Sequence, residues 1–211
     1  MGAVAFCAQR PRIAAPDCPY AWVNMPVLND ESVFEVWTCA QPVVREDTGE
    51  LSSARNEAML FGCLQLRLDR ALDAASYLAY SRIFDFIDSL GYGHLLRVWN
   101  YFPQINADAD GTERYVRFNA GRHEAFAANG RVIATDTPAA CALGSRGHQS
   151  GHLFSGRETG RATGGESPPN QRLSVSRAVR AAQPNFCARD VDANCRRVAA
   201  VRFRDRQYCR A

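Results

Sequence analysis

Tyr115 and Arg122 are the two side chains whose types and spacing best fit a binding function. In the segment from Glu113 to Phe126 the apolar residues recur at intervals of three and four, so we expect a helix that carries Tyr115 and Arg122 on one face. A phenol and a guanidinium on one face can hold a carboxylate, the phenol through one hydrogen bond and the guanidinium through two. The structural alternative is that Tyr115 and Phe118 are core residues and Arg122 faces water, as most charged helix residues do.

A strand and a turn must precede this helix to position it. Residues 95–102 form an apolar run rich in β-forming residues, and the proline after them ends the run because it cannot donate to a central ladder. Asp108, Asp110 and Thr112 then offer side-chain oxygens to the free amides of a helix start. Gly111 relaxes the turn between them. The segment is therefore predicted to be a buried strand, a turn and a side-chain-capped helix.

The rest of the first 143 residues is typical of an α+β fold, a mixed sheet with helices packed on one face. Residues 1–19 hold three prolines and no sustained period, which predicts an irregular arm. Residues 69–90 have helical periodicity and end at Gly91. A right-handed crossover of this length would set the strands before and after this helix parallel. The remaining predicted strands are residues 33–39, 59–68 and 131–135. Gly62, inside the second of these, indicates a bulge or a close approach.

The sequence predicts no metal site. The run from Asn106 to Gly111 matches the first half of a calcium-binding loop, but position twelve is Arg117, where a bidentate glutamate is required. His148 and His152 have the spacing of metal ligands on a helix, but their glycine-rich surroundings disfavour a helix. The eight cysteines include no C-x-x-C pair. Because no signal peptide or membrane-spanning run is recognisable, we expect free thiols and a cytoplasmic protein.

Residues 144–211 differ in composition from the part before them. Residues 1–143 hold 12 arginines and 17 acidic residues, a net charge of −5, whereas residues 144–211 hold 13 arginines and 5 acidic residues, a net charge of +8. The second part has no apolar period and few long aliphatic side chains, so it cannot bury enough surface to offset its chain entropy. We therefore expect a domain over residues 1–143 and an irregular or disordered, arginine-rich tail over residues 144–211.

The exact residues around Tyr115 identify a protein family more specifically than their helical periodicity does. The segments W-N-Y-F-P-Q-I-N, which starts at Trp99, and E-R-Y-V-R-F-N-A-G-R-H-E-A-F, which starts at Glu113, resemble the N-terminal domain of the chorismatase family, enzymes that split pyruvate from chorismate. The resemblance implies that Tyr115 and Arg122 contact the substrate, a chorismate-like dicarboxylic acid, and that no cofactor takes part. Some members of the family carry the label of a pteridine-dependent dioxygenase, but the sequence shows no iron-ligand triad that would support it.

The resemblance also implies a mechanism for intact relatives. A glutamic acid with a raised pKa protonates the enolpyruvyl ether, and the products are pyruvate with a dihydroxycyclohexadiene acid or a hydroxybenzoate. That glutamate, with further substrate-binding Tyr and Arg residues, comes from the family's C-terminal part, so no catalytic residue is assigned in this chain. Because chorismate is a dianion, the role implied for Arg122 is to hold charge rather than to move protons.

We hypothesise that a slip of one base in the reading frame produced the arginine-rich composition of residues 144–211. Back-translation from Leu153 with one nucleotide removed permits Y-F-L-A-A-K-P-G-V-P-P-V-E-N-P, and the same shift from Ser174 permits a second long string. Both strings resemble the continuing chorismatase sequence, which predicts a frameshift near residues 144–152 and an inactive, truncated chorismatase-like protein.

Two alternatives stay open. The first part of the chain could be a non-catalytic module that binds small acids. The arginine-rich tail could also bind nucleic acid, which the frameshift hypothesis does not favour. The expected partner is a small molecule rather than a membrane, and the sequence does not indicate an oligomeric state.

Overall fold

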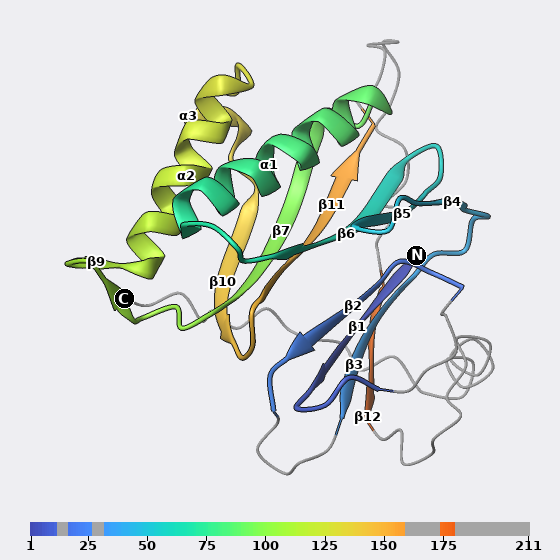
Figure 1. Ribbon diagram of the computed structural model, residues 1–211. Helices are drawn as coiled ribbons and strands as arrows, with labels where there is room; N and C mark the ends of the chain where they lie inside the picture. The colour runs from blue at the N-terminus through green and yellow to red at the C-terminus, as the bar shows by residue number, and fades with distance from the viewer. Residues whose placement is uncertain (12–16, 27–31, 159–173, 180–211) are drawn as a thin grey trace.

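The computed structural model describes residues 1–11, 17–26, 32–158 and 174–179 (Figure 1). The larger of its sheets has six strands, in the order β10-β7-β11-β6-β5-β4, and two long helices cover one face of this sheet. These strands and helices are β4 (Val44–Asp47), β5 (Leu51–Arg55), β6 (Met59–Arg67), α1 (Leu72–Ser89), β7 (His94–Pro103), α2 (Arg114–Ala128), β10 (Ala139–Ser145) and β11 (Gln149–Arg157). The α+β class predicted from the sequence is confirmed.

The strands before and after α1 run parallel, as the crossover rule predicts, but they are not neighbours. β11 lies between β6 and β7 and pairs antiparallel with both, so β6 and β7 have the same direction. β10 pairs parallel with β7 at one edge of the sheet. β5 pairs antiparallel with β6, and the β4–β5 hairpin forms the other edge. The last strand of the sheet in sequence order is therefore central in space.

The tail begins later than the boundary predicted at residue 143. That boundary falls inside β10, and the prediction that the chain is irregular from residue 144 is wrong for residues 144–145 and for β11, whose residues 150–156 are all buried. It is also wrong for the strand β12 (Ser174–Val179), which pairs antiparallel with β3 (Val33–Thr38). Strand β11 could not be predicted from the sequence because its residues, S-G-H-L-F-S-G, are mostly small or polar and do not alternate between apolar and polar positions. Residues 159–173 and 180–211 lie outside the described residues, so disorder there stays a prediction.

A large side chain of β11 fills the space left by a glycine of the neighbouring strand β6. Phe154 pairs with Gly62 of β6, and a Cβ atom on Gly62 would lie 2.2 Å from the Phe154 ring. The close approach predicted at Gly62 is thus confirmed. The aromatic ring fills the space above the glycine, which fixes the register of the two strands.

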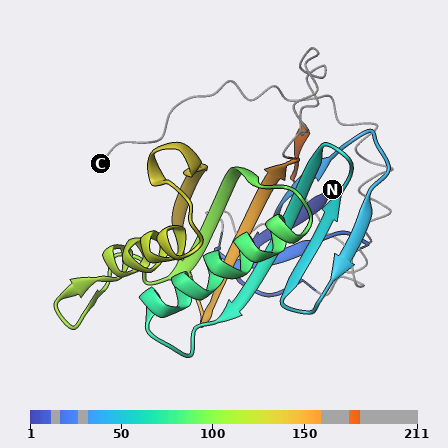
Figure 2. The same ribbon diagram turned by 90° about the horizontal axis from the view of Figure 1, so that it is seen from above.

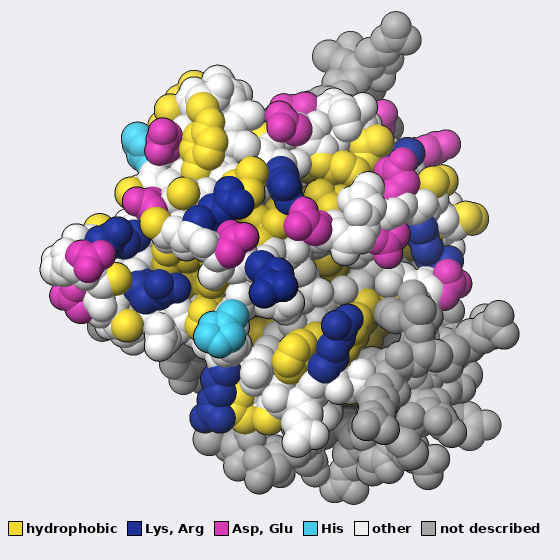
Figure 3. Space-filling model, viewed as in Figure 1, with side chains coloured by type: hydrophobic (Ala, Val, Ile, Leu, Met, Phe, Trp, Pro, Cys, Tyr) yellow, Lys and Arg dark blue, Asp and Glu magenta, His cyan; other side chains and the backbone are white. Residues whose placement is uncertain are grey.

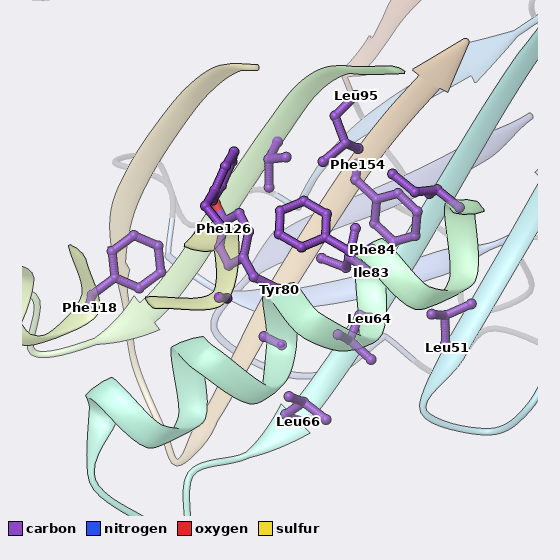
Figure 4. Packing of buried hydrophobic residues seen from close by; sticks show 14 of the residues in the cluster. Leu51, Leu64, Leu66, Tyr80, Ile83, Phe84, Leu95, Phe118, Phe126 and Phe154 are labelled. Carbon is purple, nitrogen blue, oxygen red and sulfur yellow. The ribbon is translucent and has the colours of Figure 1, made fainter. Parts of the chain in front are cut away.

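Helices α1 and α2 enclose the main core against the sheet (Figure 4). α1 matches the predicted helix, and Gly91, with a φ of 78°, follows its last turn. The two helix backbones come so close at Gly121 that a Cβ there would lie 1.9 Å from the carbonyl oxygen of Asp73. Large side chains that are fully buried in this layer include Tyr80, Ile83, Phe84, Phe118 and Phe154.

The four-stranded sheet packs on the face of the six-stranded sheet that is opposite the helices (Figure 2). Its order is β12-β3-β1-β2, and its strands are β1 (Gly2–Cys7), β2 (Tyr20–Asn24), β3 (Val33–Thr38) and β12 (Ser174–Val179). The irregular arm predicted for residues 1–19 is therefore wrong for residues 2–7. β1 is a short strand of small residues with too few positions to show a period. The core between the sheets includes Val4, Trp37, Phe61, Tyr101 and Leu153.

Two local predictions are also wrong. The capping oxygens predicted before α2 do not cap it: the two short strands β8 (Asp108–Ala109) and β9 (Thr112–Glu113) form a hairpin there, and the N-cap makes no side-chain hydrogen bond. The strand predicted over residues 131–135 is replaced by a short helix, α3 (Ile133–Asp136). Its start is held by the Asp136 carboxylate, which accepts a hydrogen bond from the backbone N–H of Val132 at 2.6 Å.

Candidate functional site

Tyr115 and Arg122 lie on either side of Phe118 along α2. The Tyr115 ring is 42% exposed and stacks beside the Phe118 ring, with centroids 6.5 Å apart and an interplanar angle of 15°. The Arg122 side chain is half-buried, and its Cζ lies 6.0 Å from the centroid of the same ring. The structure therefore brings the two predicted site residues together around one aromatic side chain. Their role in binding stays a prediction.

Phe118 ties this face of α2 to the sheet. It is 1% exposed and stacks on Phe102 of β7, with centroids 4.7 Å apart and an interplanar angle of 24°. At the start of the helix, the backbone N–H of Tyr115 donates to the carbonyl of Ile105 at 3.1 Å. Buried packing of this kind restricts how far the helix can shift, so it holds the exposed phenol in place relative to the sheet.

A buried polar network lies behind Arg122, and sequence analysis did not predict it. Tyr80 of α1, Asn100 of β7 and His152 of β11 are each at most 2% exposed. The Tyr80 hydroxyl lies 3.2 Å from Asn100 Oδ1, and His152 Nδ1 lies 3.0 Å from the same oxygen. His152 Nε2 contacts Ser150 Oγ at 3.2 Å, and Asn100 Nδ2 donates to the Cys141 carbonyl at 2.9 Å. The network joins four chain segments through one amide.

Burial and neighbouring groups set the pKa values of this network. Burial raises the pKa of the Tyr80 phenol, while the charge of Arg122 and hydrogen bonding with Asn100 and Arg122 oppose the rise. Arg122 and Tyr80 both lie against the Phe118 ring, with the Arg122 Cζ 6.0 Å and the Tyr80 ring centroid 6.2 Å from its centroid. Burial lowers the pKa of His152 to about 4, because the imidazolium would have to exist without water.

Stability should fall on mild acidification because of His152. The pKa of His152 in the folded protein, about 4, lies below the ordinary value of 6.5. The stability that its neutral form contributes is therefore complete above pH 6.5 and is lost as the pH falls toward 4. The loss amounts to roughly 3 kcal/mol at most, at about 1.4 kcal/mol for each pKa unit. Urea unfolding of the wild type and of His152→Asn at pH 7 and pH 4.5 measures it. The wild type should lose more stability than the variant between these values, and equal losses would exclude His152 as the cause.

A separate pocket of about 290 Å³ lies near the β10–β11 turn, away from α2. Its described lining comes from the segments around β2, β6, β7 and that turn, and it includes Arg10, Arg67, Arg146 and His148. None of the described lining residues belongs to α1 or α2, so Tyr115 and Arg122 are not part of this pocket. The predicted carboxylate site is instead an open surface next to a buried network.

The described residues offer no obvious metal or membrane site. No group of three or more His, Cys, Asp or Glu side chains within the described ranges is placed to hold a metal ion. His148 and His152 are not on a helix, as predicted from their glycine-rich setting. Among the described helices, none is long and apolar enough to cross a membrane. On the face seen in Figure 3, arginines are interspersed with acidic side chains and do not form one continuous basic patch.

The comparisons with known proteins agree with the fold. Two sheets with helices on one outer face define an α+β protein, and residues 35–154 match the family model described as "Chorismatase FkbO/Hyg5-like, N-terminal". The chain belongs to this chorismatase family.

Three relatives and one solved structure illustrate the similarity. A chorismatase of Streptomyces rapamycinicus is 37% identical over 134 residues, which are 63% of this chain and 40% of that protein. A chorismatase of Streptomyces hygroscopicus is 37% identical over 61% of this chain and 38% of its own length, and a 3-hydroxybenzoate synthase of the same organism is 30% identical over 61% and 38%. A chorismatase crystal structure aligns with a TM-score of 0.67 and 30% identity over 76% of this chain and 49% of that one. The chain thus spans about two fifths of the length of these curated relatives.

Proposed function

We propose that this chain is the substrate-holding N-terminal part of a chorismatase-type enzyme and that Tyr115 and Arg122 bind a carboxylate of a chorismate-like acid. The observation that carries the proposal is the placement of a phenol and a half-buried guanidinium on either side of the buried Phe118 ring. A guanidinium beside an aromatic ring has lost part of its hydration and offers a carboxylate two parallel hydrogen bonds. Tyr115 adds one O–H donor from the exposed side.

The roles proposed for the two side chains concern binding and orientation. Arg122 neutralises one carboxylate of the dianion, and Tyr115 fixes its direction. The proton for the enolpyruvyl ether has to come from an acid, and Glu113 and Glu124, at the start of α2 and within it, are exposed. A glutamate that acts as a general acid near neutral pH needs a closed, partly desolvated site. The proposal therefore assigns no catalytic acid to the described residues, and it includes no cofactor.

The proposal includes a frame slip that removes the second half of the active site. The family match ends at residue 154, beside Leu153, where the shifted reading begins to resemble the family. The composition changes in the same region, from a net charge of −5 over residues 1–143 to +8 over residues 144–211. A chain built in this way binds the substrate weakly and does not release pyruvate. Sequencing of the coding DNA tests the slip directly, because stops or unrelated codons in the shifted frame would exclude it.

We also propose a cytoplasmic location. Chorismatase relatives act on a small acid, and Cys7, Cys39 and Cys63 are free thiols, which suits a reducing compartment. Fractionation of the native host measures this, and recovery of the protein outside the cytoplasm would contradict it.

The binding role predicts a specific loss in Arg122→Ala. Hydrogen bonds to a charged group are worth about 1.5–3 kcal/mol, so chorismate affinity should fall roughly ten- to a hundredfold in calorimetric titration. Tyr115→Phe removes a single donor and should cost less. The matched control is Arg82→Ala, which removes the same charge from α1, where Arg82 pairs with Glu50 at the surface. Equal affinities of the Arg122 and Arg82 variants would contradict the assigned site.

A further inference from the structure

We propose that Tyr80, Asn100 and His152 are positioning residues: their buried hydrogen-bond chain holds the Arg122 guanidinium in place for a carboxylate. This inference rests on the function proposed for Arg122. None of the three residues is exposed enough to touch a substrate on the surface of α2, since their exposures are 0%, 0% and 2%. Arg122 is the link between the buried chain and the exposed Tyr115, because its Cζ lies 6.0 Å from the centroid of the Phe118 ring and the Tyr80 ring packs on the same ring with centroids 6.2 Å apart.

The direction of each hydrogen bond follows from one amide. The Cys141 carbonyl can only accept, so the group that faces it at 2.9 Å is the NH₂ of Asn100. Asn100 Oδ1 therefore faces Tyr80 and His152, and as a carbonyl oxygen it accepts from both. Tyr80 must donate its hydroxyl hydrogen, and His152 must carry its hydrogen on Nδ1.

The directions of the remaining hydrogen bonds in this network are then determined. A neutral His152 with hydrogen on Nδ1 has an unprotonated Nε2, which accepts from the Ser150 hydroxyl at 3.2 Å. Because the Tyr80 hydroxyl hydrogen is used on Asn100, its oxygen keeps its lone pairs, and the positive charge of Arg122 opposes the rise in the Tyr80 pKa that burial causes. Every member of the chain is satisfied in a single arrangement. A satisfied buried network is rigid, and it fixes the Tyr80 ring, which packs against the Phe118 ring beside which Arg122 lies.

A partly pre-oriented guanidinium loses less freedom when a carboxylate binds. The Phe118 ring supports it on one side, with the Cζ of Arg122 6.0 Å from the ring centroid, and the buried Tyr80 ring packs against the same Phe118 ring with centroids 6.2 Å apart. Binding groups that are fixed in advance bind more tightly than mobile ones that make the same contacts.

The test compares Tyr80→Phe with Tyr92→Phe. Both changes remove one buried phenol oxygen, but the Tyr92 hydroxyl donates to the Asn56 carbonyl, and the charged groups that act on it are Arg55, Glu57 and Glu158. Chorismate affinity should fall roughly tenfold in Tyr80→Phe and stay within about twofold of the wild type in Tyr92→Phe. In the Arg122→Ala background Tyr80→Phe should change the affinity little, because the residue through which it acts is absent.

A second readout does not depend on the substrate. Arg122 should react with phenylglyoxal several-fold faster in Tyr80→Phe than in the wild type or in Tyr92→Phe, as followed by mass spectrometry of the Arg122 peptide. A wild-type chain that fails to bind chorismate would refute the proposed function, while faster labelling in Tyr80→Phe would still support positioning. Labelling of Arg122 at the wild-type rate in Tyr80→Phe, with the same fold retained, would overturn the positioning role.

Discussion

Phe154→Ala should lower the free energy of unfolding by about 3–5 kcal/mol, the usual cost of removing a buried aromatic side chain from a core. Phe154 is 0% exposed and lies in β11, the strand between β6 and β7. Its ring covers Gly62 and meets Phe86 of α1, with centroids 6.4 Å apart. The variant therefore loses contacts to a neighbouring strand and to the helix layer together. Urea denaturation followed by circular dichroism measures the change.

A double-mutant cycle with Gly62 shows whether this contact is the cause. Gly62→Ala places a Cβ 2.2 Å from the Phe154 ring and should destabilise the wild type by about 1–3 kcal/mol through overpacking. In the Phe154→Ala background the same change has room and should be close to neutral. The matched control is Gly151→Ala, where an added Cβ meets nothing within 4 Å. Independent effects of the Gly62 and Phe154 variants would mean that β11 does not lie in this register.

The largest change in activity should follow from correcting the reading frame. Removal of one nucleotide at Leu153 would replace the written L-F-S-G-R at residues 153–157 by Y-F-L-A-A and continue with family-like sequence. Both readings keep a phenylalanine at residue 154, above Gly62, so the sheet can form in either case. The corrected chain would regain the part that is proposed to supply the catalytic acid. We expect pyruvate release from chorismate to rise from background to enzymatic turnover.

The sequence predicted the long periodic elements better than the short ones. The helix over residues 69–90 and the one that begins at Glu113 were found because apolar residues on one face recur over several turns. β1 and β11 were missed because small residues can be buried without an alternating pattern of apolar and polar positions. The pair of β6 and β7 was correctly predicted to be parallel, yet the strand between them comes more than forty residues after β7 begins.

The candidate site was predictable only where its residues share one helix. Tyr115 and Arg122 are seven positions apart, and helix geometry alone places them on one face. Asn100 and His152 are 52 residues apart, and no local rule joins them. One local signal was present: an asparagine inside the apolar run W-N-Y-F must find hydrogen-bond partners once the strand is buried. The spacing of His148 and His152 indicates only metal ligation, whereas the neutral ring of His152 serves as a donor and acceptor in the core.

Pyruvate release from chorismate, measured side by side for the chain as written, the frame-corrected chain and the frame-corrected chain with Arg122→Ala, tests the central claim most directly. The claim is that this chain keeps the carboxylate-binding helix of a chorismatase and lacks its catalytic part. It predicts no release by the first protein, turnover by the second, and a reduction of roughly ten- to a hundredfold in kcat/KM in the third. Enzymatic release of pyruvate by the chain as written, or a corrected chain that is indifferent to Arg122→Ala, would contradict it.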